Sequence, residues 1–446
     1  MKLKKFAVII VAMAICLTSI ACASQSGGGD TTQSAAGSGT VAGSDAAGPA
    51  QNSEVMTIWH SWTTNNDANG NAYKELLAQW EKDHPNVKVE EDATENEAYK
   101  TKIKTAIAAN EAPDVFFSWG LGFAAPFAEA GSLLALDEYL ADGTKDRILP
   151  GALDNFSYNG KVYGLPYNAN VCALFCNKEL FDKYGVKLPE TNEELLQAVK
   201  TFKAQGLVPM AVGAKDAWTA MFYHNVYTVK TAGAKAVKAA LTGEGSYDTP
   251  DFIKGVSKLE ELIKAGAFDP SALALTYDEA KIPFMNGEIP MIYQGSWIVS
   301  EIQDESLSKV KDKVVAIKFP TVEGSEQYAT EAHGGATDCF MVSSSATNKD
   351  TAVGFVKYVS EGISGLSFKY GGGIPLWKSE QADNANIDAL TRQLVDISSQ
   401  ITDSVVSWDV FLSGEATERH KSLVQQVFAG QLTPEEFVKD MQVLNQ

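Results

Sequence analysis

Basic side chains are scarce in this sequence. Its 446 residues include 37 Lys and Arg against 56 Asp and Glu, which gives a formal net charge of −19. A nucleic-acid interface needs clustered cations to neutralise phosphates, so this composition excludes nucleic acid as a partner. The charge instead favours solubility and a neutral or cationic ligand.

Cysteine is also rare. Two of the five cysteines, Cys16 and Cys22, lie in the first 22 residues, which leaves Cys172, Cys176 and Cys339 for the rest of the chain. The segment "VCALFCN" has the pattern of a strand, and four strand residues span roughly 13 Å. That distance excludes a disulfide between Cys172 and Cys176. The sequence therefore predicts buried free thiols.

Local motifs for catalysis and metal binding are missing. The five histidines are scattered without zinc-like spacing, and the chain has no G-x-S-x-G segment and no P-loop. We therefore predict no metal ion, no cofactor and no catalysis. An exported glycosidase stays open as an alternative, because its two carboxylates can be distant in the chain.

Long apolar runs are missing except at the N-terminus. Three lysines among the first five residues precede the apolar run Phe6 to Ile15, which is too short for a membrane span and is typical of an export signal. The run is followed by Ser19-Ile20-Ala21-Cys22, which resembles a bacterial lipobox, in which the cysteine is lipidated. We predict a lipoprotein signal peptide over residues 1–22 with lipidation at Cys22. An ordinary secretory signal cut near Ala23 is the alternative.

The next segment, residues 23–53, consists almost entirely of Gly, Ser, Ala, Thr and polar residues. Such a segment cannot bury enough apolar surface to offset its chain entropy, so we predict a disordered tether. About 390 residues follow, which is too many for one core and enough for two lobes. We expect an exported protein held by its lipid on the outer face of a bacterial cell membrane.

The part of the chain after residue 53 begins with alternating strand and helix patterns. "VMTIWHSW", "NVKVEED" and "DVFFSW" have strand patterns, and "AYKELLAQWEKDHP" carries apolar residues at helical spacing between the first two. A second helical segment, "AYKTKIKTAIAANEAPD", precedes the third strand. Strands that alternate with helices predict an α/β lobe with parallel pairing. The C-terminal half is mostly helical in pattern.

Five tryptophans lie at predicted strand ends or in segments flanked by polar or small residues. They are Trp62, Trp119, Trp218, Trp297 and Trp408. Indole rings stack on the apolar faces of sugars, and a few planar polar groups then bind the hydroxyls. Because clefts in open α/β sheets lie at the carboxyl ends of strands, this pattern predicts an aromatic sugar site. A polyamine or a metal chelate on the same fold stays open, although a cationic ligand would need a cluster of acids in the cleft.

Several longer segments carry a family resemblance. The most specific are "YGLPYNANVCALFCNKELFDKYGVKLPETNEEL", "FMNGEIPMIYQGSW", "FPTVEG" and "GGGIPLWK". Over essentially all of residues 54–446 the chain resembles the extracellular solute-binding proteins of carbohydrate ABC importers, of the maltose-binding-like type. Two positions depart from the family pattern: Cys176 replaces the usual Tyr before Asn177-Lys178, and Asn192 replaces a Trp at a helix start.

The resemblance implies a two-lobed α/β fold of the periplasmic-binding-protein type (type II), with a ligand cleft between the lobes. Lobe I would comprise residues 54–168 and 317–360, and lobe II residues 169–316 and 361–446. The chain would cross between the lobes near Tyr167 to Asn170, near Phe319 to Thr321, and after Ser360. The two lobes would close around the ligand by a hinge motion.

The resemblance also implies a set of ligand contacts at strand ends and at the hinge. These are Trp62, Asn65, Asn66, Asp67, Trp119, Asn168, Asn170, Trp218, Trp297, Gly334, Gly335, Asp338, Trp408 and Asp409. Gly295 and Ser296 would keep a turn narrow, so that the Trp297 ring projects into the cleft as a stacking floor. The ligand would be a di- or oligosaccharide, and the partners would be the membrane permease subunits of the importer. The receptor would act as a monomer.

Overall fold

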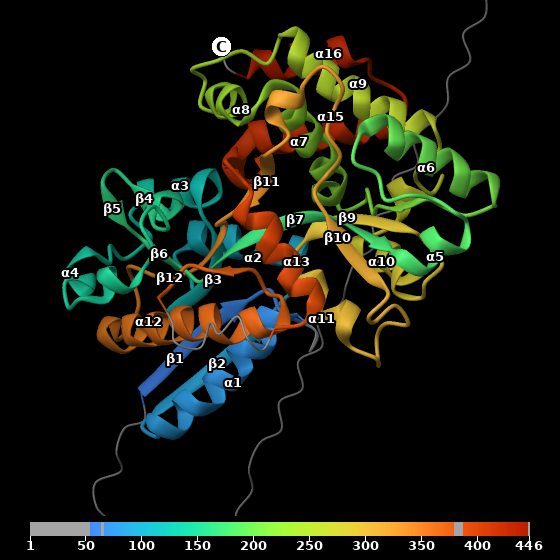
Figure 1. Ribbon diagram of the computed structural model, residues 1–446. Helices are drawn as coiled ribbons and strands as arrows, with labels where there is room; N and C mark the ends of the chain where they lie inside the picture. Colours follow the sequence, from blue (N-terminus) through green and yellow to red (C-terminus); the bar gives the residue numbers. More distant parts are fainter. Residues whose placement is uncertain (1–53, 64–66, 379–386, 445–446) are drawn as a thin grey trace, which may run out of the picture. The chain divides into compact units, whose positions relative to one another are not determined.

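The described part of the chain forms two large sheets that are covered by helices, and a separate two-stranded sheet (Figure 1). The computed structural model describes residues 54–63, 67–378 and 387–444. The predicted signal peptide, its lipidation site Cys22 and the predicted tether lie outside the described residues, as do Asn65 and Asn66. Within the described residues, no helix is both long enough and apolar enough to cross a membrane.

The first sheet has five strands in the order β2-β1-β3-β12-β6. They are β1 (Glu54–His60), β2 (Val87–Ala93), β3 (Val115–Trp119), β6 (Gly164–Pro166) and β12 (Asp338–Val342). Strand β1 runs parallel to β2 and β3, whereas β12 runs antiparallel to β3 and β6. The predicted parallel pairing of the first three strands is therefore confirmed.

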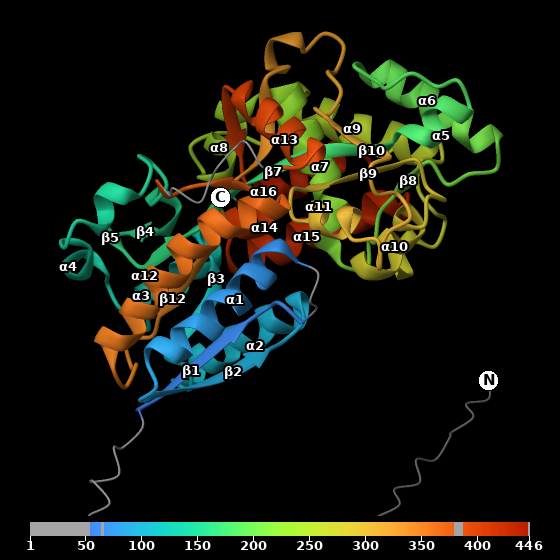
Figure 2. The same ribbon diagram turned by 60° about the horizontal axis from the view of Figure 1, so that its bottom comes forward.

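Helices complete this first lobe. They are α1 (Ala68–Asp83), α2 (Asn96–Ala109), α3 (Leu121–Glu129), α4 (Asp137–Leu140) and α12 (Lys349–Leu366), with the short elements η1 (Thr144–Arg147), η2 (Asp154–Phe156), β4 (Ser157–Tyr158) and β5 (Lys161–Val162). Helices α1 and α12 lie side by side (Figures 1 and 2). The apolar core contains Tyr73 of α1, stacked on Phe340 of β12 with ring centroids 5.9 Å apart.

The second sheet is built around one long strand, β7. Its strands are β7 (Asn168–Asn177), β8 (Met210–Ala211), β9 (Met291–Gly295), β10 (Val314–Ile317), β11 (Glu331–Gly335), β13 (Ile374–Pro375) and β14 (Asp403–Val405). Strand β7 pairs antiparallel with β9, β10, β11 and β13. This strand therefore contacts four neighbours along its ten residues.

Helices cover both faces of the second sheet and complete the second lobe. They are α5 (Lys178–Lys183), α6 (Asn192–Ala204), α7 (Ala217–Ala232), α8 (Ala234–Leu241), α9 (Pro250–Lys264), α10 (Tyr277–Met285), α11 (Ile298–Gln303), α13 (Ala389–Ser399), α14 (Trp408–Phe411), α15 (Gly414–Phe428) and α16 (Pro434–Val443), with η3 (Ala272–Ala274) and η4 (Glu326–Tyr328). The short helix η5 (Ser367–Tyr370) follows α12 and packs mainly on α12 and α1 of the first lobe. Every residue of α7 is buried. A capping box of Thr433 and Glu436 begins α16.

The chain passes between the two sheets at short segments. Tyr167 separates β6 of the first sheet from β7 of the second. The return passage lies between Gly335, which pairs with β7, and Asp338, which pairs with β3. The predicted return near residues 317–321 is therefore placed too early, because β10 and β11 both pair with β7. Helix α12 then packs on the first lobe as far as Leu366.

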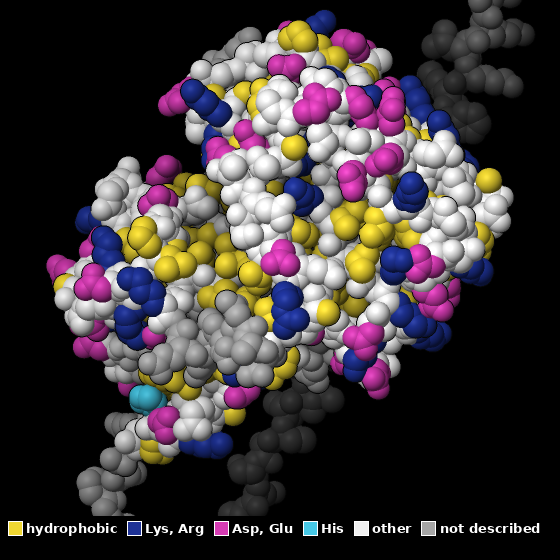
Figure 3. Space-filling view, viewed as in Figure 1, with side chains coloured by type: hydrophobic (Ala, Val, Ile, Leu, Met, Phe, Trp, Pro, Cys, Tyr) yellow, Lys and Arg dark blue, Asp and Glu magenta, His cyan; other side chains and the backbone are white. Residues whose placement is uncertain are grey.

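Charged side chains of both signs are interspersed over the face seen in Figure 3. The predicted free thiols are confirmed for Cys172, Cys176 and Cys339, which are buried and unbridged. Burial raises the pKa of the Cys339 thiol well above its usual range, so this group stays protonated.

Candidate functional site

A cavity of about 220 Å³ lies between the two lobes. Both lobes contribute to its wall through strand ends and helix starts: β1, β3, β12, α1 and α2 from the first lobe, and β7, β11, α7, α10, α11 and α14 from the second. This is the position that open α/β sheets favour for ligands. The wall combines aromatic rings, amides and charged groups.

Two tryptophans of the first lobe line the cavity. Trp62 follows β1 and packs against Tyr73 and Phe117 at ring-centroid distances of 5.4 Å. Trp119 is the last residue of β3, and the Lys100 ammonium lies 5.0 Å from its ring centroid. Both indoles are more than nine-tenths buried, so each offers one edge or face to the cavity while the core fixes its position.

Trp297 and Trp218 line the cavity from the second lobe, with ring centroids 6.2 Å apart. Strand β9 ends at Gly295, and the Trp297 ring folds back over that glycine. A Cβ at position 295 would come within 2.0 Å of the Trp297 ring. Gly295 thus leaves the space that the Trp297 ring fills, and the ring is the least buried of the four indoles in the wall.

Two amide side chains in the wall hold an acceptor without a partner. The Asn170 amide donates to Thr337 Oγ1 at 3.2 Å and to Asp338 Oδ2 at 3.3 Å, which leaves Asn170 Oδ1 buried and unpaired among the described residues. Asn96 Oδ1, at the start of α2, is in the same situation. A buried acceptor without a partner costs free energy, so each is a position where a ligand hydroxyl would stabilise the protein.

Asp67 begins α1 as its N-cap, and its Oδ1 accepts from the backbone N–H groups of Asn69 and Gly70 at 2.8 and 2.9 Å. Burial raises the pKa of Asp67 to about 6, against the lowering effect of those hydrogen bonds. The carboxylates of Glu301 and Asp338 raise it further. Burial also raises the pKa of Asp338 itself. The carboxylates around the cavity therefore repel one another.

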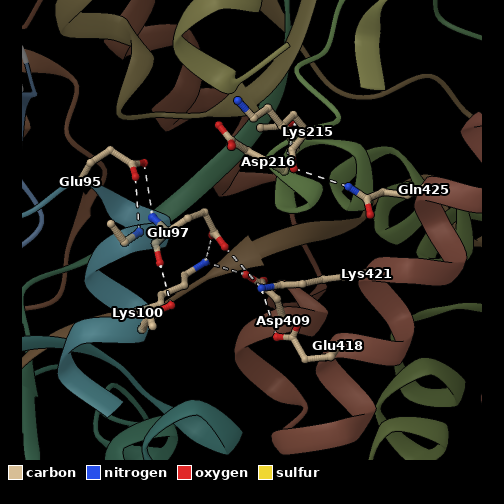
Figure 4. A network of polar contacts seen from close by, with 12 residues as sticks. Glu95, Glu97, Lys100, Lys215, Asp216, Asp409, Glu418, Lys421 and Gln425 are labelled. Atoms are coloured by element: carbon tan, nitrogen blue, oxygen red, sulfur yellow. Dashed lines mark hydrogen bonds and ion pairs between the residues drawn. The ribbon is translucent and has the colours of Figure 1, made fainter. Parts of the chain in front are cut away.

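Lys100 is one of the two lysines in the described wall of the cavity, and it joins the two lobes (Figure 4). Its ammonium donates to Glu97 Oε1 at 2.7 Å within α2 and to Asp409 Oδ2 of α14 at 3.1 Å. Glu97 also pairs with Lys421 of α15 at 3.5 Å, and Lys421 pairs with Glu418. Burial disfavours the charged Lys100, but Asp409 and Glu97 outweigh this effect and raise the pKa of its ammonium.

Lys281 of α10 is the second lysine in the wall. Its ammonium donates to Asp278 Oδ1 and to Glu301 Oε1, both at 2.8 Å. Burial disfavours its charge, but the neighbouring Tyr277 hydroxyl and Glu301 carboxylate raise its pKa. On the same side of the cavity, the Tyr277 backbone N–H donates to Asp216 Oδ2 at 2.7 Å.

The structure places most of the predicted site residues at one cavity. Those in its wall are Trp62, Asp67, Trp119, Asn170, Trp218, Trp297, Gly334, Gly335, Asp338 and Asp409. Gly334 has φ 135°, and a Cβ there would come within 2.6 Å of the Asn170 carbonyl oxygen, so only glycine fits this strand pairing.

Two predicted site residues do not line the cavity. Trp408 is fully buried and stacks on His420, with ring centroids 4.7 Å apart, because its short helix α14 turns the indole into the core of the second lobe. Asn168 is also fully buried; its amide donates to Asn69 Oδ1 at 2.8 Å and to the Gly372 carbonyl at 2.6 Å. Neither side chain therefore reaches the cavity wall in this structure.

Sequence reasoning missed the charged part of the wall. Lys100, Asp216, Asp278, Lys281 and Glu301 all line the cavity, and none was predicted to do so. Lys100, Asp278 and Lys281 lie on helices that also carry exposed polar residues, so their pattern matches an ordinary exposed face. Seven Asp and Glu side chains line the described wall in addition to its aromatic and amide residues.

Comparisons with known proteins agree with this geometry. A solved structure from work on xylan utilization by the thermophilic bacterium Caldanaerobius polysaccharolyticus is 44% identical, with a TM-score of 0.84, and covers 87% of this chain and 99% of that one. A chitin oligosaccharide binding protein is 27% identical, with a TM-score of 0.80, over 88% and 98% of the two chains. An ABC transporter extracellular-binding protein of Pyrococcus horikoshii is 28% identical over 58% of this chain and 63% of its own length, which is less than two thirds.

The likeness to these structures confirms the predicted two-lobed α/β fold class. The description of the bacterial extracellular solute-binding protein family matches residues 64–361, which is more than half of the chain. With the cavity between two α/β lobes and this match, the chain belongs to the bacterial extracellular solute-binding proteins.

Proposed function

We propose that this protein is the substrate-binding receptor of a carbohydrate ABC importer and that it captures a di- or oligosaccharide in the cavity between its lobes. The observation that carries the proposal is the wall itself. Four indole rings from both lobes face one space that also contains two unpaired amide acceptors. Sugar rings stack on indoles, and their hydroxyls can donate to such acceptors.

The relatives support a β-linked oligosaccharide as the ligand. The work on the 44% identical structure concerns xylan utilization, and the 27% identical one is a chitin oligosaccharide binding protein. We therefore expect linear xylo-oligosaccharides to bind first, and chito-oligosaccharides as the next class. Aromatic rings on both lobes favour two or more sugar units, because each unit needs its own face.

A fluorescence titration tests this function. The purified protein is titrated with xylo-oligosaccharides of two to five units, chito-oligosaccharides, raffinose and galactose, and tryptophan emission is followed. We expect a saturable change with an oligosaccharide, and recovery of the intact sugar afterwards. A sugar recovered in cleaved form would instead support the glycosidase alternative, and no response to any of these sugars would contradict the proposal.

A cationic solute such as a polyamine is the second candidate, and the carboxylates favour it. Seven Asp and Glu line the described wall against two lysines, so the cavity carries an excess of negative charge. The same titration with spermidine and putrescine separates the two functions. Binding of a polyamine without any sugar response would replace the sugar proposal.

We also propose that Cys22 carries a lipid that holds the receptor on the outer face of the cell membrane beside its permease. The receptor acts there as a monomer, and its sugar-loaded form delivers the bound sugar to the permease. Cys22→Ser should move the protein from the membrane fraction to the soluble exported fraction, whereas Cys339→Ser serves as the cysteine control. Equal membrane association of both variants would contradict the anchor.

A further inference from the structure

We propose that the charges of the cavity make this receptor selective for uncharged oligosaccharides and cause it to reject sugars that carry a carboxylate. This inference rests on the proposed function and concerns which members of the sugar class can enter. It follows from how each cation of the wall is already paired, and from where the remaining carboxylates lie.

The first cation, the Lys100 ammonium, forms ion pairs with two carboxylates. The Lys100 ammonium contacts Glu97 at 2.7 Å and Asp409 at 3.1 Å, and its side chain is only 10% exposed. Figure 4 shows the three groups converging from α2 and α14, with Lys421 pairing on the far side of Glu97. One hydrogen of the Lys100 ammonium remains for a ligand oxygen. The positive charge of this ammonium is already neutralised by the carboxylates of Glu97 and Asp409.

The second cation repeats this arrangement on the other side of the cavity. The Lys281 ammonium contacts Asp278 and Glu301 at 2.8 Å each, and its side chain is 14% exposed. The two lysines in the described wall thus face four carboxylates. Lys215 lies near Asp216 (Figure 4), but its side chain is exposed and does not line the cavity.

The remaining carboxylates of the wall have no cation of their own. Asp67 and Glu95 are held by backbone N–H groups, Asp216 by the Tyr277 N–H, and Asp338 by Thr337 and Asn170. Uncharged donors orient these oxygens for sugar hydroxyls, and they leave the negative charge of the cavity uncompensated.

The raised pKa of Asp67 indicates the burial and the repulsion that a carboxylate of a bound ligand would meet in this cavity. This pKa is raised to about 6 by burial and then by the charges of Glu301, from the second lobe, and Asp338, from the first. A uronic acid held among the same groups would meet the same desolvation and the same repulsion from both lobes. It would find no unpaired cation in the described wall, whereas a neutral sugar meets neither penalty.

The test compares a neutral sugar with the same sugar carrying one acidic group. Xylotetraose and xylotetraose carrying one glucuronosyl branch are titrated calorimetrically into the purified protein at pH 7.5. We expect the charged sugar to bind at least about 100-fold more weakly. If the panel above identifies a neutral hexose oligosaccharide, the pair is that sugar and its analogue oxidised at C6 to the uronic acid. Equal affinity for both members would overturn the charge selection, whereas no binding of any neutral sugar would overturn the proposed function instead.

A variant separates charge from the bulk of the branch. Glu301→Gln removes one carboxylate beside Lys281 and keeps the size of the side chain, so we expect the ratio of the two affinities to fall by about tenfold. Glu260→Gln is the matched control, because Glu260 pairs with Lys264 on α9 outside the cavity wall. An unchanged ratio in Glu301→Gln would mean that the branch is excluded by size, and it would overturn the electrostatic explanation.

Discussion

The Lys100–Asp409 ion pair should stabilise the folded protein through the contact between its lobes. Lys100→Met removes the ammonium and keeps most of the apolar side-chain volume. Both partners are almost buried, with side chains 10% and 6% exposed, so the change leaves the Asp409 carboxylate without its cation. Removing one partner of a buried pair costs about 3–5 kcal/mol. Because Asp409 also borders the cavity, water compensates part of this loss, and we expect about 2–3 kcal/mol.

Urea unfolding followed by tryptophan emission measures this loss, and a double variant identifies its cause. In Lys100→Met with Asp409→Asn the unpaired charge is gone, so the double variant should recover at least half of the stability that the single variant loses. Lys264→Met is the matched control: its ammonium pairs with Glu260 at 2.7 Å, but it is 69% exposed, so a loss below about 0.5 kcal/mol is expected. Additive losses in the double variant would refute the reasoning, because they would mean that the two side chains do not act as a pair.

Three further predictions concern the binding cavity. Trp297→Ala should weaken sugar binding at least about tenfold in calorimetry, because a stacking face is lost; unchanged affinity would show that the ring does not contact the ligand. Gly295→Ala should weaken binding to a similar extent, because its Cβ displaces the Trp297 ring. Gly354→Ala, in α12 outside the cavity wall, should not, because its Cβ would meet only Trp80 at 3.6 Å. Sugar affinity should rise as the pH increases through about 6, because hydroxyls donate to the ionised Asp67, whose pKa is raised to that value. Asp67→Asn keeps the helix cap and should flatten this pH profile; a profile that persists in the variant would assign it to another group.

The sequence predicts this site best where a residue position follows from strand geometry. Trp62, Trp119 and Trp297 lie at or just after strand ends, and the carboxyl ends of strands converge, so the pattern alone brings them to one place. Trp408 also has polar neighbours in sequence, but it begins a helix that directs the indole into the core. The local pattern contains no information on that direction.

The charged wall and the second passage between the lobes could not be predicted for a related reason. Lys100 and Asp409 are 309 residues apart, and their contact depends on how two lobes meet. The apolar pattern of strand β10 is compatible with either sheet. Its membership of the second sheet is visible only from its antiparallel pairing with β7 in the structure. Both features depend on long-range contacts, which leave no periodic signal in a single sequence.

Strand β7 has a mechanical consequence for the second lobe. A strand hydrogen-bonded to four neighbours resists bending, since any curvature would strain several ladders at once. We expect any rotation of one lobe relative to the other to bend the chain at its passages between the two sheets, which lie at Tyr167, at residues 336–337 and between α12 and β13. Asn170 lies three residues from the first of these passages and already faces the cavity. The part of the second lobe nearest this passage therefore also borders the cavity, so a rotation of the lobes about Tyr167 would change the position of Asn170 in the cavity wall.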